Sequence, residues 1–291
     1  MDTNYSIPRR LWRILYPPII FVAVQFLVMG VVAFVSGISI AYDALQRGIS
    51  ISDSEYVLEE ALRFAVEHSM LILLVTNLIC IAVFVPIWLR TRKRADPFEN
   101  DKPALACLLV VGLFAAYNII QMMVFALTDV MKYFPDYEGV TEMLVTDSFW
   151  IQLLSIGLVA PVAEELVFRG ILITRMRWLP AWAAVLVQGV LFGLVHMNLF
   201  QGLYAFVAGI LLGLIFVKFR SIIIVIAGHM AFNISSLLLS EFASERGAGV
   251  VVVASVILLP LCAVFTIIHK KARRLPVMRD IMPPPVYPAG P

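Results

Sequence analysis

One apolar segment, residues 148–174, is the most informative about the fold and reads SFWIQLLSIGLVAPVAEELVFRGILIT. It is long enough to cross the hydrocarbon core of a bilayer, which takes about 20 mostly apolar residues. Its only charged residues are Glu164, Glu165 and Arg169. A charge near the middle of a membrane helix costs about 2.5–3.5 kcal/mol on insertion scales, so such residues are expected to face a bundle interior or an aqueous cavity and to have a function.

Similar apolar runs recur along the whole chain. Of its 291 residues, 61% are hydrophobic and 14% are charged, whereas a soluble domain has about 25% charged residues. The composition excludes an ordinary soluble protein and predicts an all-α, polytopic transmembrane helical bundle. We expect about eight spans, over residues 14–40, 66–89, 104–128, 148–174, 180–197, 199–217, 221–240 and 250–269.

The basic residues predict the orientation of this bundle. If the N-terminus is cytoplasmic, most Lys and Arg fall in inner segments, and the outer segments hold only Arg47, Arg63, Lys132 and Arg246. Cytoplasmic loops of membrane proteins carry such an excess of positive charge. We therefore expect an integral membrane protein of a bacterial plasma membrane with both termini in the cytoplasm. The long first apolar run is interpreted as an uncleaved span, because no small-x-small cleavage site follows it.

The two adjacent carboxylates of the fourth predicted span are expected to differ in their partners. Glu165 and Arg169 are four residues apart with Glu first, which is the favourable order for a helical ion pair. Arg169 is therefore predicted to neutralise Glu165. Glu164 projects about 100° away on a helix with 3.6 residues per turn and has no local partner. It is predicted to be the carboxylate left free for residues of other helices.

Two histidines in other spans are candidates to meet Glu164. His196 lies in the fifth predicted span, four residues after Phe192, and His229 lies in the seventh, four residues before Asn233. Residues four apart share one helix face, so Phe192 is expected to pack beside His196, and Asn233 is expected to lie beside His229. At 1.5 Å per residue, Glu164, His196 and His229 lie at similar depths, roughly 14–24 Å from the inner surface.

A glutamate and two histidines suit two kinds of hydrolysis. In one, Glu164, His196 and His229 bind a divalent metal such as zinc and leave a position open for water. In the other, no metal is needed, because Glu164 acts as general base on a water that a histidine holds. His229 and Asn233 could then donate hydrogen bonds to a tetrahedral oxyanion. Both schemes lead to amide hydrolysis, and the absence of an H-E-x-x-H motif favours the scheme without an obligatory metal.

Three short patterns resemble a known family. They are Glu164-Glu165-x-x-x-Arg169, Phe192-x-x-x-His196 and His229-x-x-x-Asn233. In this order they resemble the motifs of the CAAX-protease and bacteriocin-processing family of intramembrane proteases, which includes the type II CAAX prenyl endopeptidases. The resemblance implies that Glu164 and His196 activate water and that His229 and Asn233 form the oxyanion site. It also implies that Glu165, Arg169 and Phe192 support them.

The resemblance covers residues 148–240 and suggests how the chain is organised. The expected segments are a cytoplasmic N-terminus over 1–13, three helices with outer loops over 14–147, a catalytic core of four helices over 148–240, a last transmembrane helix over 250–269 and a Pro-rich cytoplasmic tail over 270–291. The implied partners are the lipid bilayer and a membrane-embedded or lipidated protein or peptide substrate, with no nucleic acid.

Other functions remain open at this point. Intramembrane Glu and His residues also form proton relays, so a proton-coupled transporter is an alternative. A non-catalytic scaffold or bacteriocin-immunity protein that retains the pattern is another. Away from these patterns, buried polar residues such as Gln188 are interpreted as interhelical hydrogen bonds, and Gly209 and Gly213 as a seam of close helix packing.

Overall fold

The computed structural model describes residues 7–48, 54–92, 103–128, 130–134 and 148–241. Within these ranges the chain is helical and contains no strand, which confirms the predicted all-α class. The last predicted span, over 250–269, and the Pro-rich tail lie outside the described residues. The elements are α1 (Ile7–Gln46), α2 (Ser54–Glu67), α3 (Ser69–Arg92), α4 (Pro103–Thr128), η1 (Val130–Tyr133), α6 (Phe149–Gln152), η2 (Leu153–Val159), α7 (Ala160–Glu165), η3 (Leu166–Ile173), α8 (Ala181–Leu194), α9 (Leu199–Phe219) and α10 (Ile222–Glu241).

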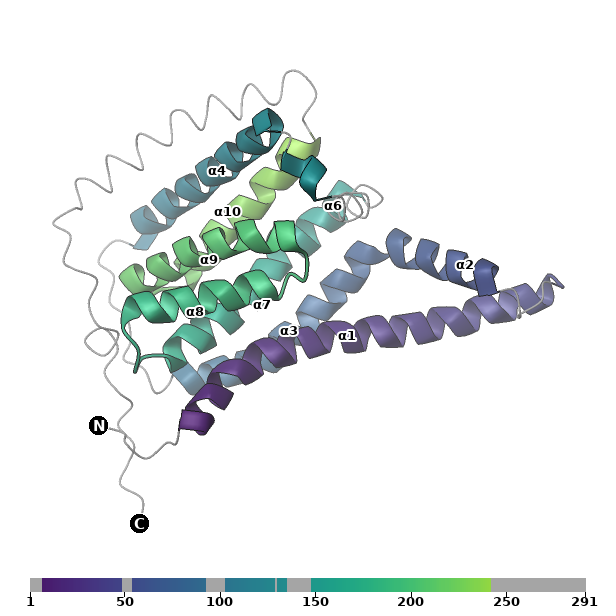
Figure 1. Cartoon of the computed structure of the whole chain (residues 1–291), viewed down its shortest axis with the longest axis horizontal. Helices are drawn as coiled ribbons and strands as arrows, with labels where there is room; N and C mark the ends of the chain where they lie inside the picture. Colours follow the sequence, from purple (N-terminus) through teal and green to yellow (C-terminus); the bar gives the residue numbers. More distant parts are fainter. Residues whose placement is uncertain (1–6, 49–53, 93–102, 129, 135–147, 242–291) are drawn as a thin grey trace, which may run out of the picture.

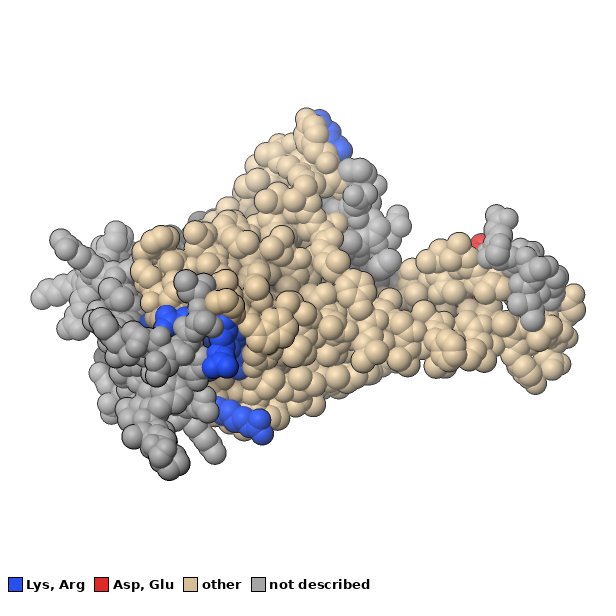
Figure 2. Space-filling model, turned by 60° about the horizontal axis from the view of Figure 1, so that its bottom comes forward, with Lys and Arg blue, Asp and Glu red and all other residues tan. Residues whose placement is uncertain are grey.

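Five of the described helices are long and apolar enough to cross a bilayer. They cover Pro8–Gln46, Ser69–Thr91, Ala106–Phe125, Leu199–Phe219 and Ile222–Glu241. The space-filling view agrees with a membrane location, because on the face that it shows Lys and Arg gather at a few places and most of the described residues are uncharged (Figure 2). The outer part of α1 carries large exposed apolar side chains such as Phe34, which is 71% exposed. Together with α2 it extends away from the other helices (Figure 1).

The fourth predicted span is a continuous helical path of four segments, α6, η2, α7 and η3, rather than one α-helix. Segments η2 and η3 have the wider π-helical hydrogen-bond pattern, which is rare and often found at functional sites. This path lies at the centre of the bundle, because η2, α7 and η3 all contact both α3 and α10. Helix α10 also packs along α4, and α8 packs along α9 (Figure 1).

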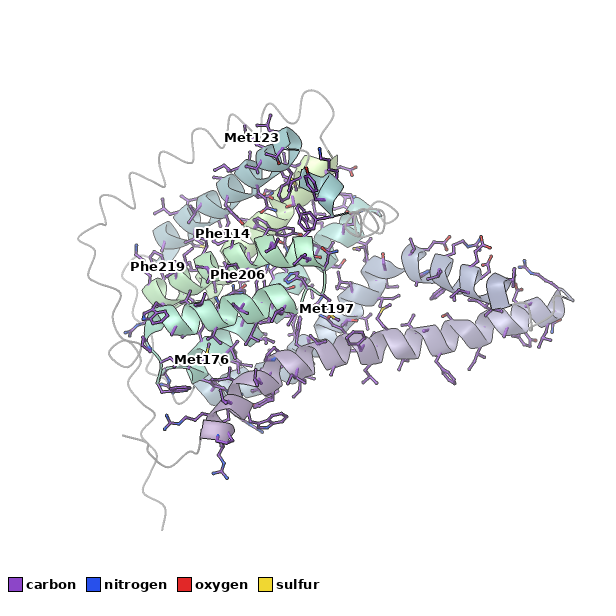
Figure 3. All side chains as sticks on the ribbon, viewed as in Figure 1. Phe114, Met123, Met176, Met197, Phe206 and Phe219 are labelled. Carbon is purple, nitrogen blue, oxygen red and sulfur yellow. The ribbon has the colours of Figure 1, made fainter. Side chains whose placement is uncertain are left out.

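The fifth predicted span is shorter than the sequence suggested. We predicted residues 180–197, but α8 ends at Leu194, and its 14 residues extend only about 21 Å. A tight turn follows, in which Met197 has a φ of 53°; Figure 3 labels this residue beside the turn. The side chain of Asn198 then accepts a hydrogen bond from the Gln201 amide and caps α9. Because α8 ends at Leu194, His196 lies in the turn rather than inside the helix.

Glycines bring α8 and α9 into backbone contact. A Cβ atom at Gly193 would lie 2.6 Å from the Gly202 carbonyl oxygen, and one at Gly209 would lie 3.2 Å from the Gly189 Cα. The predicted packing seam at Gly209 and Gly213 is therefore confirmed. Small residues allow this approach in membranes, where helix association depends on close van der Waals contact.

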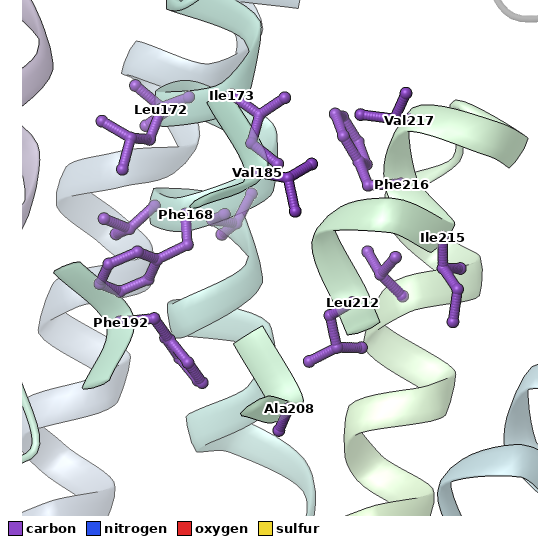
Figure 4. Close-up of a cluster of buried hydrophobic side chains, with 14 of the residues drawn as sticks. Phe168, Leu172, Ile173, Val185, Phe192, Ala208, Leu212, Ile215, Phe216 and Val217 are labelled. Atoms are coloured by element: carbon purple, nitrogen blue, oxygen red, sulfur yellow. The ribbon is translucent and has the colours of Figure 1, made fainter. Parts of the chain in front are cut away.

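The apolar core lies beside this seam. Figure 4 shows Phe168 of η3 near Phe192 of α8, with side chains of α9 such as Leu212 on the other side. The rings of Phe168 and Phe192 meet edge to face with their centroids 5.0 Å apart. The core thus joins η3, α8 and α9 and fixes the orientation of the charged segment.

Candidate active site

The buried ion pair predicted within the fourth span is present. Arg169 Nη1 lies 2.7 Å from Glu165 Oε1, and both side chains are fully buried. An unpaired ion at this depth would be costly, so the pair must be formed for either residue to remain charged. The guanidinium of Arg169 also lies over the face of Phe192, 4.6 Å from the ring centroid. The ion pair and this cation–π contact hold the cation on one side of the site.

Glu165 has a second partner that the sequence did not indicate. His229 Nδ1 lies 2.8 Å from the same Oε1 atom of Glu165. We predicted that Glu164 would face His229, and Glu164 Oε2 does lie 3.7 Å from His229 Nε2, although this is beyond hydrogen-bonding distance. Glu165 therefore joins Arg169 of η3 to His229 of α10, because one carboxylate oxygen can accept two hydrogen bonds.

Glu164 is the more accessible of the two carboxylates. Its side chain is 17% exposed, whereas that of Glu165 is fully buried. Within the described residues Glu164 forms no hydrogen bond, and its nearest cationic or imidazole group is His229. Glu164 is thus the free carboxylate, as predicted, and it is the one that solvent or a substrate could reach.

His196 lies in the turn after α8, and its ring is held by its own helix end. Its Nδ1 atom lies 2.7 Å from the Phe192 carbonyl oxygen. A carbonyl oxygen only accepts, so Nδ1 carries the proton and Nε2 of the neutral ring is an acceptor. No direct hydrogen bond joins His196 to Glu164 or His229 among the described residues. The two histidines instead share Phe192, whose ring centroid lies 5.0 Å from that of His196 and 5.8 Å from that of His229.

Asn233 is bound to the fourth span. Its Nδ2 atom donates to the Ile156 carbonyl oxygen over 2.8 Å. In the π-helical pattern of η2 the Ala160 amide donates to the carbonyl oxygen of Ser155, five residues earlier. By the same pattern, the Ile156 carbonyl oxygen would accept from the amide of residue 161. That residue is Pro161, which has no amide hydrogen. The Asn233 side chain supplies the missing donor, and this structural role is one that the sequence analysis did not foresee.

The donor set does not have the arrangement of a metal site. Among the described residues, no group of three or more His, Cys, Asp or Glu side chains lies close enough together to hold a metal ion. The predicted set of Glu164, His196 and His229 is therefore not assembled as metal ligands in the part of the chain that the structure describes. The metalloprotease interpretation has no support in this geometry.

The fold and this site together define a class of protein. The chain is an integral membrane helical bundle with a buried carboxylate, arginine and histidine cluster at its centre. Residues 146–235, which contain every predicted site residue, match the family model described as type II CAAX prenyl endopeptidase Rce1-like. Residues 146–235 are thus similar to this family, which confirms the resemblance inferred from the three motifs. The match supports a membrane endopeptidase in general terms.

Two further comparisons gave no relatives. No curated protein and no solved structure matched the chain. The family match covers only residues 146–235, from just before α6 into α10, so it makes no statement about α1 to α4.

One connection beside the ion pair escaped the sequence analysis. Gln188 Nε2 donates to the Gly209 carbonyl oxygen over 2.6 Å, and Arg169 Nη2 donates to the same oxygen over 3.1 Å. The sequence marked Gln188 as an interhelical hydrogen bond, and this is confirmed. Its connection to Arg169 could not be found from spacing, since the shared acceptor is a backbone atom of a third helix.

Proposed function

We propose that this chain is an intramembrane endopeptidase that hydrolyses a peptide bond of a membrane-anchored or lipidated protein or peptide. Glu164, His196, His229 and Asn233 are the proposed catalytic residues, and Glu165, Arg169 and Phe192 are the proposed supporting residues. The observation that carries the proposal is the contrast between the two carboxylates. Glu165 is buried and bound by Arg169 and His229, whereas Glu164 is partly exposed and unbound next to the same histidine.

Glu164 is proposed as the general base. A base must reach the water it deprotonates, and the exposed fraction of Glu164 and its lack of a hydrogen-bond partner support this role. His196 is proposed to hold the same water. Because its Nδ1 proton is directed to the Phe192 carbonyl, its Nε2 atom is the nitrogen that would accept a hydrogen bond from the water.

The water attacks the carbonyl carbon of the scissile amide while Glu164 takes one of its protons. The carbonyl π electrons move to the oxygen, which becomes a tetrahedral oxyanion. Collapse of this intermediate breaks the C–N bond, and Glu164 returns the proton to the leaving amine. The products are a carboxylic acid and an amine, and no oxidant or reductant is required.

His229 is proposed to stabilise the oxyanion, with Glu165 fixing the direction of its ring. Since His229 Nδ1 donates to Glu165, its Nε2 can donate to an oxyanion only when the ring carries a second proton. Asn233 Nδ2 uses one of its two hydrogens for Ile156, so the other is available to the oxyanion.

A membrane-anchored substrate is supported by the surroundings of the site. The site residues lie on helices whose exposed side chains are largely apolar, and such surfaces face lipid rather than water. A peptide that is held in the bilayer by a lipid group or its own apolar segment can reach such a site by lateral diffusion.

The proposal is tested with purified protein in detergent or in lipid vesicles. Wild type, Glu164→Ala and His229→Ala are incubated with lipidated and unlipidated peptides, and products are identified by mass spectrometry. Cleavage by wild type with loss in both variants is the expected result. Equal cleavage by all three would overturn the site assignment. Proton-driven uptake into vesicles that is lost in Glu164→Gln, without any cleavage, would overturn the peptidase and favour a transporter.

A further inference from the structure

A single backbone oxygen connects three helical elements beside the site. The Gly209 carbonyl of α9 accepts from Gln188 Nε2 of α8 and from Arg169 Nη2 of η3. Both Gln188 and Arg169 are fully buried. Hydrogen bonds to a carbonyl from buried side chains of two other elements fix the positions of those side chains, since neither has access to bulk water as an alternative partner.

The glycines of the seam make this oxygen accessible. A Cβ atom at Gly213 would lie 2.6 Å from Gln188 Nε2, and a Cβ at Gly209 would lie 3.1 Å from Phe192 Cδ1. Any larger side chain at either position would displace the Gln188 amide or the Phe192 ring. The seam is therefore required for the Gln188 side chain to reach α9.

The Arg169 guanidinium is held on three sides as a result. Nη1 binds Glu165, Nη2 binds the Gly209 carbonyl, and the planar group lies over Phe192. Glu165 in turn binds His229. A chain of direct contacts thus runs from Gln188 through the Gly209 carbonyl, Arg169 and Glu165 to the imidazole beside Glu164.

We propose that Gln188 is a positioning residue for the site. It fixes the Gly209 carbonyl relative to η3, so that Arg169 and Glu165 hold the His229 ring in the orientation that presents Nε2 toward Glu164. Gln188 does not touch the reacting atoms. The expected effect of Gln188 on turnover rests on the proposed function. Its expected effect on the orientation of the His229 ring does not depend on any activity.

A second buried polar residue, Asn118, serves as a matched control, because it joins two helices by hydrogen bonds without taking part in this chain of contacts. Asn118 of α4 is fully buried, and its Nδ2 donates to Ser235 Oγ of α10 over 2.9 Å. No contact connects it to Arg169 or Glu165 among the described residues. Asn118→Leu therefore removes interhelical hydrogen bonds of the same kind without disturbing the anchored arginine.

The kinetic test compares Gln188→Leu with Asn118→Leu in the peptide cleavage assay. Because small displacements of catalytic groups reduce turnover strongly, we expect Gln188→Leu to lower kcat by about 10-fold or more with KM nearly unchanged. Asn118→Leu is expected to keep kcat within about 2-fold of wild type, since it leaves the anchored arginine in place. Equal kcat values for the two variants would overturn the proposal.

A second measurement is independent of activity. Diethyl pyrocarbonate modifies accessible imidazoles, and mass spectrometry gives the rate for each histidine. His229 is 7% exposed, so its rate is expected to be low in wild type and to rise severalfold in Gln188→Leu, whereas the rate at His68, at the junction of α2 and α3, stays constant. An unchanged His229 rate would overturn the positioning role. If wild type cleaves no peptide, the proposed function fails, and this labelling still decides the role of Gln188.

A third variant covers the case in which Gln188→Leu does not fold. Gly213→Ala keeps the glutamine but places a methyl group against its amide, while alanine raises helix propensity by about 1 kcal/mol relative to glycine in a helix interior. We expect faster labelling of His229 and a lower kcat, as for Gln188→Leu. A Gly213→Ala protein with wild-type labelling and wild-type kcat would contradict the proposal.

Discussion

Glu165 and His229 lie 64 positions apart in the sequence and are joined by a hydrogen bond of 2.8 Å between Oε1 and Nδ1. The same oxygen accepts from Arg169. The carboxylate is therefore a bridge between the ion pair of the fourth span and the imidazole of α10, and the neighbouring Glu164 is left free of both. This division of the two adjacent carboxylates is the basis of the following predictions.

The variants Glu164→Gln and Glu165→Gln should differ in their effects on kcat and on the melting temperature. Glu164→Gln removes the proposed general base, which is expected to lower kcat by about 10²–10⁴-fold, but it breaks no hydrogen bond and should leave the melting temperature nearly unchanged. Glu165→Gln weakens the pairs with Arg169 and His229 and should reduce both kcat and the melting temperature. Parallel cleavage and thermal unfolding measurements in detergent check this, and an active Glu164→Gln protein would contradict it.

Removing Arg169 should be more harmful than removing the whole ion pair. Arg169→Met leaves Glu165 buried without its cation, and loss of one partner of a buried pair typically costs about 3–5 kcal/mol. The double variant Glu165→Leu, Arg169→Met removes both charges and is expected to recover much of the lost unfolding free energy. It should remain inactive, because His229 loses its partner. A double variant less stable than Arg169→Met would show that the pair itself stabilises the fold.

Replacing Pro161 should compensate for part of the stability that is lost when Asn233 is replaced. Asn233→Ala leaves the Ile156 carbonyl without its donor, which is expected to cost about 1–3 kcal/mol. Adding Pro161→Ala restores an amide hydrogen at the position from which η2 would supply that donor. The double variant should therefore regain stability in thermal unfolding without regaining full turnover. No recovery would mean that the Ile156 carbonyl does not depend on these donors.

The glycine contact between α8 and α9 should be sensitive to a single methyl group. Gly193→Ala places a Cβ atom 2.6 Å from the Gly202 carbonyl oxygen, which forces the helices apart near His196 and should cost about 1–3 kcal/mol. Gly30→Ala in α1 meets nothing within 4 Å and serves as the control, expected to be neutral or stabilising. The unfolding free energies of both variants in detergent test this difference. Equal effects would argue against close packing of α8 on α9.

The proposed orientation places both chain termini in the cytoplasm. Reporter domains that are active on only one side of the membrane, fused to the N-terminus and to the C-terminus, should both give the cytoplasmic signal. A reporter inserted in the loop after α1 should give the opposite signal. Opposite signals from the two termini would require an odd number of spans and would contradict the predicted eight.

The sequence alone determined the features that depend on composition and on local spacing. Apolar runs of sufficient length predict membrane helices because the bilayer imposes a fixed thickness. The Glu165–Arg169 pair followed from a spacing of four residues on one helix, and the three motifs predicted which segments carry the site. These properties do not depend on how the helices are arranged around one another.

Which partner each polar group has depends instead on how the helices pack. Adjacent residues on an α-helix point about 100° apart, and the π-helical segments on either side of α7 change that direction, so spacing could not assign His229 to Glu165 rather than Glu164. The Asn233 bond to Ile156 arises from a proline in another element, and the Gln188 link to Arg169 passes through a backbone oxygen of α9. Such contacts require helices that are distant in sequence to approach at a specific rotation and depth, and that rotation is set by the packing of the whole bundle.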